Sequence, residues 1–349
     1  MMNETKQILQ DSDASTLAPL PPSATTPRRG GLGSISWDVV WERYGIATIL
    51  VLLWVVAYFN VNYFGNVDNF AEVLRQSSFV GIAAVGMTYV ILMGAFDLSV
   101  VSTLGLCAWL AVTLASKHQL GLALTLPLLV GIGIGMLNGT MVAYLRIPAF
   151  IVTLAMQFLI RGYTFIVAGG DNALYAGKEY TSLGTGFIAG VPTPFIIFII
   201  VAVVGAVVLR NTPFGRYIYA AGSNAQAAQV AGVPVKRTLF WGFVVVGGCT
   251  ALAAVLLGAR LYTAGPGLEP GFELNVIAAV VLGGTRLSGG RGSLIGTFAA
   301  AILFTTLSNV LNLLSIDPFV QQVVTGSVLL IALSVEGVRS RLAERLNRG

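Results

Sequence analysis

Charged residues are scarce in this chain. Asp, Glu, Lys and Arg make up 10% of its 349 residues, against roughly 25% in ordinary globular domains. Hydrophobic residues make up 56% of the sequence, and the mean hydropathy is +0.82. A soluble protein of this length cannot bury that much apolar surface. The composition therefore excludes a soluble globular domain and predicts an all-α polytopic membrane protein.

Reactive side chains are equally rare. The two cysteines, Cys107 and Cys249, both lie within apolar runs, which argues against a disulfide framework or a metal site. The single histidine, His118, follows Lys117 at the end of an apolar segment, where a solvated loop residue is expected. A membrane-embedded enzyme would need several His, Cys or acidic residues in its spans. We therefore expect no catalytic residues, no metal ligands and no enzyme activity in this chain.

Both ends of the chain lack long apolar runs. Residues 1–36 are rich in Ser, Thr, Pro and Asp, which predicts a disordered tail. They also lack the short apolar stretch and small-residue cleavage site of a signal peptide. Residues 337–349 form a basic tail. The residues between these tails, 37–336, are expected to be the transmembrane domain.

About ten apolar segments approach the roughly 20 residues that a membrane-spanning helix needs. The predicted spans are 45–64, 73–94, 99–116, 121–145, 149–168, 193–210, 238–262, 274–285, 294–312 and 319–336. The eighth is too short to cross a bilayer alone. It is expected to be a half-helix, or to be completed by the glycine-rich residues that follow it.

Lys and Arg are distributed unevenly around these spans. With both termini in the cytoplasm, fifteen of the 20 basic residues lie on the cytoplasmic side and three lie outside, while Arg161 and Arg260 fall within spans. This asymmetry predicts that both termini and segment 211–237 are cytoplasmic. It also accounts for the formal net charge of +5 without nucleic acid as a partner.

Segment 211–237 contains a short helix, predicted at 224–231. Ser223 is the expected N-cap, with Gln226 completing a capping box, while Gly232 and Pro234 end the helix. A helix of about two turns is marginal in water and needs a supporting surface. That surface is either the bilayer or another protein, and the small alanine side chains favour another protein.

Four stretches resemble a known family. They are MTYVILMGAFDLSV (87–100), IPAFIVTLAM (147–156), NTPFGRYIYAAGSNAQAAQVAGVPVKR (211–237) and FELNVIAAVVLGGTRLSGGRGSLIGT (272–297). Their order and sequence are similar to those of the permeases of ribose/xylose/galactose-type ABC importers. The resemblance implies a type II importer arrangement of about ten helices in a homodimer, in the bacterial inner membrane. It also implies two cytoplasmic ATPase subunits and a periplasmic binding protein that delivers a monosaccharide.

The resemblance makes 224–231 a coupling helix that docks on the ATPase. The residues expected to take part are Gly222, Ser223, Gln226, Ala227, Ala228, Ala231 and Gly232, with Ala227, Ala228 and Ala231 in the groove of the partner. None of the chain's four lysines lies in the phosphate-binding pattern G-x-x-x-x-G-K-[ST]. ATP and magnesium are therefore expected on the partner ATPase, and this chain is expected to carry no cofactor.

Polar residues and glycines inside or beside the spans are candidates for the translocation path and its gate. They are Asp97, Ser99, Asn138, Gly283, Gly284 and Asn309. Asp97 can cap the third span or contact the solute, and capping is favoured. The two asparagines can bond neighbouring helices or face the path. The glycines can form a cytoplasmic gate or a tight turn.

Two basic residues lie within spans, Arg161 and Arg260. Both are expected in the outer half of the membrane, paired with Glu273 or Glu269 in a network that shapes the external mouth.

Two other transport mechanisms stay open at this stage. An ion-coupled secondary transporter would need carboxylates near the middle of the membrane, and only Asp97 approaches that position. A permease of the same class for a polyol or a branched-chain amino acid is the nearer alternative.

Overall fold

The computed structural model describes residues 37–175, 177–317, 319–324, 326, 327, 330 and 334. Within that part of the chain a helix lies in each of the first nine predicted spans. These helices are α1 (Trp37–Asn60), α2 (Val67–Ile91), α3 (Val100–Ser116), α4 (Leu120–Ala143), α5 (Ala149–Ala168), α7 (Thr193–Asn211), α10 (Val235–Leu261), α11 (Phe272–Leu282) and α12 (Leu294–Leu313). Both predicted tails, and part of the tenth span at 319–336, lie outside the described residues.

Five of these helices are long and apolar enough to cross a membrane: α4, α5, α7, α10 and α12. The stretch 45–60 of α1, together with α3 and α11, is apolar but shorter. Helix α2 has 25 residues, yet its first half carries Asp68, Glu72 and Arg75. Within the described ranges the structure thus confirms a helical membrane protein with five candidate spans.

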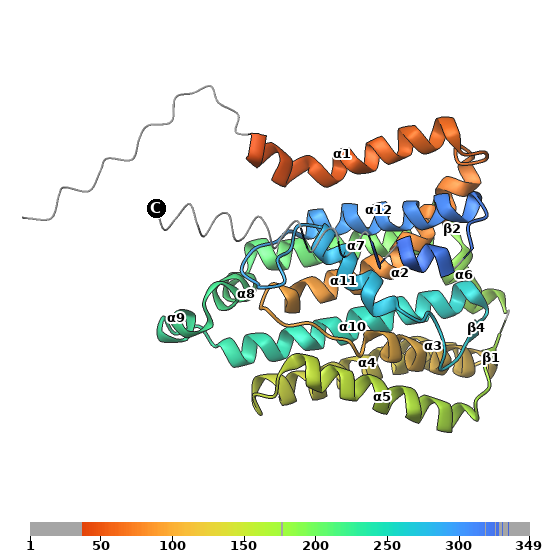
Figure 1. Ribbon diagram of the computed structural model, residues 1–349. Coiled ribbons are helices and arrows are strands. Elements are labelled where there is room, and N and C mark those ends of the chain that lie inside the picture. The colour runs from red at the N-terminus through yellow and green to blue at the C-terminus, as the bar shows by residue number, and fades with distance from the viewer. Residues whose placement is uncertain are drawn as a thin grey trace, which may run out of the picture. The chain divides into compact units, whose positions relative to one another are not determined.

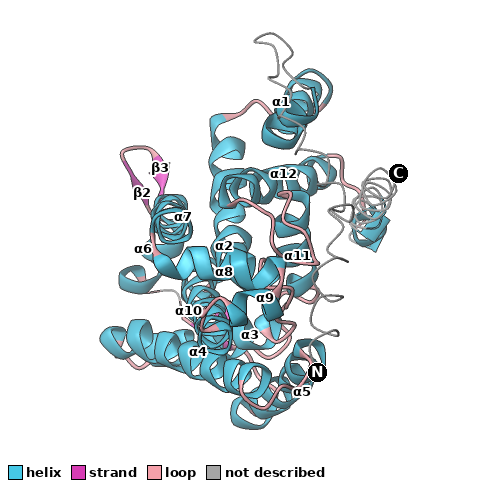
Figure 2. Ribbon diagram, turned by 90° about the vertical axis from the view of Figure 1, so that its left-hand side faces the viewer, coloured by secondary structure: helices cyan, strands magenta, loops and turns pink. Residues whose placement is uncertain are grey.

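Helix α10 lies at the centre of the bundle. It packs most extensively against α4, and then against α2 and α3. Viewed along the bundle, α3, α4 and α5 lie on one side of α10, while α2, α11 and α12 lie on the other (Figure 2). Hydrophobic residues from these helices form a continuous buried core.

The stripe of glycines along α4 is the reason why α4 and α10 pack so closely. A side-chain carbon at Gly131 would lie 2.6 Å from the carbonyl oxygen of Gly247, and one at Gly139 would lie 2.8 Å from that of Phe240. No larger residue fits between the two backbones at these positions, so the glycines allow the two helices to approach closely.

Short elements cap both ends of this bundle (Figure 1). One end carries α8 (Pro213–Ser223) and α9 (Ala225–Val230). The opposite end carries α6 (Lys178–Thr185) and two small antiparallel pairings. In the first, β1 (Ala173–Leu174) pairs with β4 (Thr263–Ala264); in the second, β2 (Phe187–Ile188) pairs with β3 (Val191–Pro192). The sequence analysis predicted none of these strands, nor α6 and α8.

Candidate functional site

The short helix α9 exists, but it begins one residue later than predicted. Asn224 is its N-cap, and the Asn224 side chain accepts a hydrogen bond from the backbone N–H of Ala227 at 2.9 Å. Ser223 instead ends α8, and its hydroxyl donates to the carbonyl of Tyr219. The predicted capping box of Ser223 and Gln226 is therefore wrong, because Asn224 already satisfies the exposed donor at the start of the helix.

The end of α9 agrees with the prediction. Gly232 has a φ of +84°, which is the left-handed conformation that glycine adopts most readily. Its N–H donates to the carbonyl of Gln229, and the N–H of Val233 donates to that of Ala228. This pair of bonds is a Schellman motif, which satisfies carbonyls that would otherwise have no partner.

The side chains of α9 divide into an inner and an outer set. Ala228 is only 6% exposed, so its methyl group contacts this chain and is not available to a partner. The expectation that Ala228 lies in a partner's groove is corrected accordingly. Gln226, Ala227 and Ala231 are exposed, and Val230 is 91% exposed.

Gly222 lies where three backbone segments converge. A side-chain carbon there would overlap the Leu92 carbonyl oxygen and lie 2.6 Å from the backbone nitrogen of Gly290. Those two groups bond each other, since the N–H of Gly290 donates to the Leu92 carbonyl at 2.8 Å. We call this meeting of the end of α2, the end of α8 and the α11–α12 loop the glycine junction, made of Leu92, Gly222 and Gly290.

The two glycines at the end of α11 have different environments. Gly283 is the C-cap of α11, at the point where the chain passes close to α12. A side-chain carbon at Gly283 would lie 2.6 Å from the backbone nitrogen of Thr297. Gly284 adopts a φ of +83° and has open space around it. Both positions form a tight turn, and a role of that turn as a gate stays a prediction.

Asp97, Ser99 and Asn138 form one buried polar cluster. Asp97 is 2% exposed and Asn138 is fully buried. The carboxylate of Asp97 accepts from the backbone N–H of Ser99 at 2.8 Å and from its hydroxyl at 2.6 Å. The side-chain amide of Asn138 donates to Asp97 at 3.1 Å and to the Ser99 oxygen at 2.9 Å. This cluster joins α4 to the loop before α3.

The N-cap of α3 is Ser99 rather than Asp97. Asp97 nevertheless accepts a backbone N–H at the helix start, as the capping hypothesis expected. Asn138 bonds a neighbouring segment, which is one of the two alternatives predicted for it.

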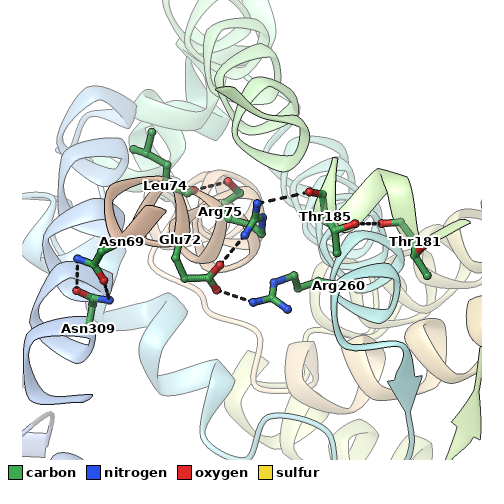
Figure 3. Close-up of polar contacts among 9 residues, drawn as sticks. Asn69, Glu72, Leu74, Arg75, Thr181, Thr185, Arg260 and Asn309 are labelled. Carbon is green, nitrogen blue, oxygen red and sulfur yellow. Dashed lines mark hydrogen bonds and ion pairs between the residues drawn. The ribbon is translucent and has the colours of Figure 1, made fainter. Parts of the chain in front are cut away.

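Asn309 also bonds a neighbouring helix. Its side-chain amide donates to the Asn69 oxygen at 2.8 Å, and the Asn69 amide donates back at 3.1 Å. The two asparagines clamp α12 to α2 (Figure 3).

Arg260 pairs with a residue that the sequence analysis did not consider. It binds Glu72 at 2.8 Å, and Arg75 binds the other carboxylate oxygen of Glu72 at 2.6 Å (Figure 3). The expected pairing of Arg260 with Glu273 or Glu269 is wrong. The missed signal is the spacing of Asn69, Glu72 and Gln76, which places three polar residues on one face of α2.

Arg161 and Glu273 line a second, smaller cavity together. Its volume is about 80 Å³, and it lies beside the loop that leads into α11. Arg161 also lies over the ring of Phe165, with 5.9 Å from the guanidinium carbon to the ring centre. Arg161 and Arg260 are thus in different groups, and their roles at an external mouth stay predictions.

The Glu72 carboxylate balances two arginines, so we expect its removal to destabilise the fold. Glu72→Ala should cost about 2 kcal/mol, below the 3–5 kcal/mol typical of a fully buried pair because this site is partly exposed. Thermal unfolding in detergent would measure the change, with the exposed Glu179→Ala at the same end as the control. Replacing Arg75 with Met as well should recover part of the loss. If Glu72→Ala and Glu179→Ala unfold alike, the ion pairs do not stabilise the fold.

Five apolar helices of membrane-spanning length, a polar-lined cavity at the α6 end and a capped short helix at the other end define the class: a multi-pass helical membrane protein. Comparison with known proteins narrows the class. Residues 69–333 match the family described as "Branched-chain amino acid transport system / permease component", and the chain belongs to that family.

Named relatives are similar over most of their length. The ribose import permease protein RbsC of Haemophilus influenzae is 39% identical, across 84% of this chain and 92% of the relative. RbsC of Escherichia coli K12 is 38% identical, across 84% and 93%. The L-arabinose ABC transporter permease protein AraH of Azospirillum brasilense is 33% identical, across 92% and 94%. No solved structure matches the chain significantly.

These matches confirm the resemblance to sugar importer permeases noted from the four sequence stretches. They also confirm that the chain is a permease subunit and not an enzyme.

Proposed function

We propose that this chain is the membrane subunit of an ATP-driven importer that translocates a monosaccharide. A periplasmic binding protein delivers the sugar, and a separate ATPase carries the ATP and magnesium. The observation that carries the coupling half of this proposal is the position of α9. Most side chains of α9 are exposed to solvent. Along the chain, α9 directly follows α8, and α8 ends at the glycine junction.

The substrate class is supported by the relatives. The family description speaks of branched-chain amino acids, whereas the relatives named above import ribose or arabinose by their names. Identity of 33–39% over most of each chain supports a pentose or hexose more strongly than an amino acid or a polyol.

The mechanism needs no covalent chemistry in this chain. Movement of α9 against the ATPase is transmitted through α8 to the glycine junction, where backbone atoms of α2 and of the α11–α12 loop are in contact. Backbone atoms cannot give way as flexible side chains do, so the three segments move together. The α11–α12 loop, which includes Gly284, then opens or closes the cytoplasmic end of the path.

The membrane arrangement is part of the same proposal. Ten spans in a type II arrangement, paired in a homodimer in the bacterial inner membrane, place α9 and both termini in the cytoplasm. Segments 1–36 and 337–349 are then cytoplasmic tails, and the end with α6 faces the periplasm and the binding protein.

A charge on the outer side of α9 should prevent docking. Val230 makes almost no contact within the chain, so Val230→Asp should leave the fold intact but place an unpaired carboxylate in an apolar contact. We expect at least a 10-fold loss of copurifying ATPase and of ATP-dependent uptake in proteoliposomes. Leu174→Asp, at a side chain that is 72% exposed at the opposite end, is the control for copurification. Normal copurification and uptake with Val230→Asp would contradict docking through α9.

The substrate itself is tested by reconstituting the chain with its ATPase and binding protein and supplying labelled ribose, arabinose, galactose, a linear polyol and leucine. ATP-dependent uptake of one of the sugars supports the proposal. Uptake of leucine alone, or of the polyol alone, would show that this solute, and not a sugar, is the substrate.

A further inference from the structure

A cavity of about 300 Å³ opens at the end of the bundle that carries α6. This volume lies at the lower end of the roughly 300–1,000 Å³ typical of small-molecule sites. Residues of α2, α10, α11 and α12 line it at helical spacing, so that each helix contributes one face. None of the residues predicted for the translocation path lines this cavity, whereas Arg260 and Glu269, both named for the external mouth, do.

The wall of the cavity contains polar groups that the chain itself does not use. Gln76 of α2, Asn275 of α11 and Glu269 of the preceding loop line it. Among the described residues, no hydrogen-bond or ion-pair partner is found for these three side chains. Each amide can donate and accept at once. Two free amides and a carboxylate around one small cavity match a ligand with several hydroxyl groups.

The charges around the cavity point to a neutral ligand. Glu72 is held between Arg75 and Arg260, so its charge is already compensated. Arg75 lies behind the cavity lining, and once it is counted two carboxylates face two guanidinium groups, so the formal charges around the cavity cancel. Buried rings of Phe272 and Phe304 supply an apolar wall.

We infer that this cavity is a selectivity site for a neutral polyhydroxylated solute, in which Gln76 and Asn275 bond its hydroxyl groups. The Glu72 ion pairs fix α2 against α10, and the Asn69–Asn309 pair fixes α2 against α12, so the helix that carries Gln76 is held in place (Figure 3). Helix α11, which carries Asn275, packs against both α2 and α12. This inference rests on the proposed function, because it makes the chain discriminate among the sugars that a binding protein delivers.

The test compares uptake of ribose and arabinose, which differ in the configuration of their hydroxyls. Gln76→Met and Asn275→Leu preserve side-chain size but remove the hydrogen bonds. Each is expected to lower kcat/KM for uptake by about 3- to 10-fold, the range of one or two lost hydrogen bonds, and to change the ratio between the two sugars. Gln119→Met, exposed at the start of α4 and outside the cavity, is the matched control.

Two measurements separate the possible failures. Copurification with the ATPase shows that a variant is assembled, and Gln76→Asn, which keeps an amide on a shorter side chain, should also change the sugar ratio. Wild-type rates and an unchanged ratio in all three variants would overturn this inference and leave the proposed function standing. If the wild-type importer takes up no sugar at all, the proposed function itself fails.

Discussion

Gly222→Ala is expected to give a protein that unfolds at least about 5 °C earlier than the parent and takes up no solute. A methyl group there would overlap the Leu92 carbonyl oxygen and crowd the nitrogen of Gly290. Overpacking costs typically 1–3 kcal/mol, and the upper end applies here because the neighbours are backbone atoms. Thermal unfolding in detergent and uptake in proteoliposomes would measure the two effects.

The control for Gly222 is Gly162→Ala in α5. Gly162 has open space around it, and alanine there should be neutral or slightly stabilising. Equal behaviour of the two variants would mean that the glycine junction is not closely packed. A variant at Gly222 that stays stable but hydrolyses ATP without uptake would still support coupling through the junction.

Asp97→Ala is expected to produce the second large loss, about 3 kcal/mol or more of unfolding free energy. The carboxylate accepts bonds from the N–H and hydroxyl of Ser99 and from the amide of Asn138. Its removal leaves these buried donors without their acceptor, at about 1–3 kcal/mol each for those that find no replacement. Chemical or thermal unfolding would measure the loss, with the exposed Asp171→Ala as the control.

An exchange of the two residues tests the cluster more sharply. Asp97→Asn places an amide opposite the amide of Asn138, while Asn138→Asp places two carboxylates together. The double variant D97N/N138D restores one donor and one acceptor, so it should be more stable than either single variant. A double variant that shows only the sum of both losses would mean that the two side chains do not interact.

Sequence periodicity was sufficient for most of the fold. Apolar runs bounded by glycine, proline and polar residues identified the helices. The exact start of α9 could not be predicted, because Ser223 and Asn224 are both good N-caps and α8 occupies Ser223. Helix α8 was missed although Thr212 and Pro213 form a typical helix start, because its 11 residues of mixed polarity are too short for a span.

The candidate site was harder to predict because it depends on contacts across the chain. Arg260 and Glu72 are separated by 188 residues in the sequence. Gly222 contacts Leu92 and Gly290, one far before it in the sequence and the other far after it. Local patterns indicate that such residues are unusual, but not which of several possible partners they contact. The polar face of α2 was the one local signal for the cavity.

Helix α2 carries residues of both functional ends. Glu72 and Gln76 lie at the cavity, and the carbonyl of Leu92, directly after the helix, lies at the glycine junction. At 1.5 Å of rise per residue, Leu92 lies about 30 Å from Glu72 and about 24 Å from Gln76 along the helix axis. Its residues from Ser77 to Ile91 are almost continuously buried, so the helix has little room to bend. On the proposed function the helix moves as one rigid body, so a small tilt imposed at the glycine junction displaces the side chain of Gln76 at the other end.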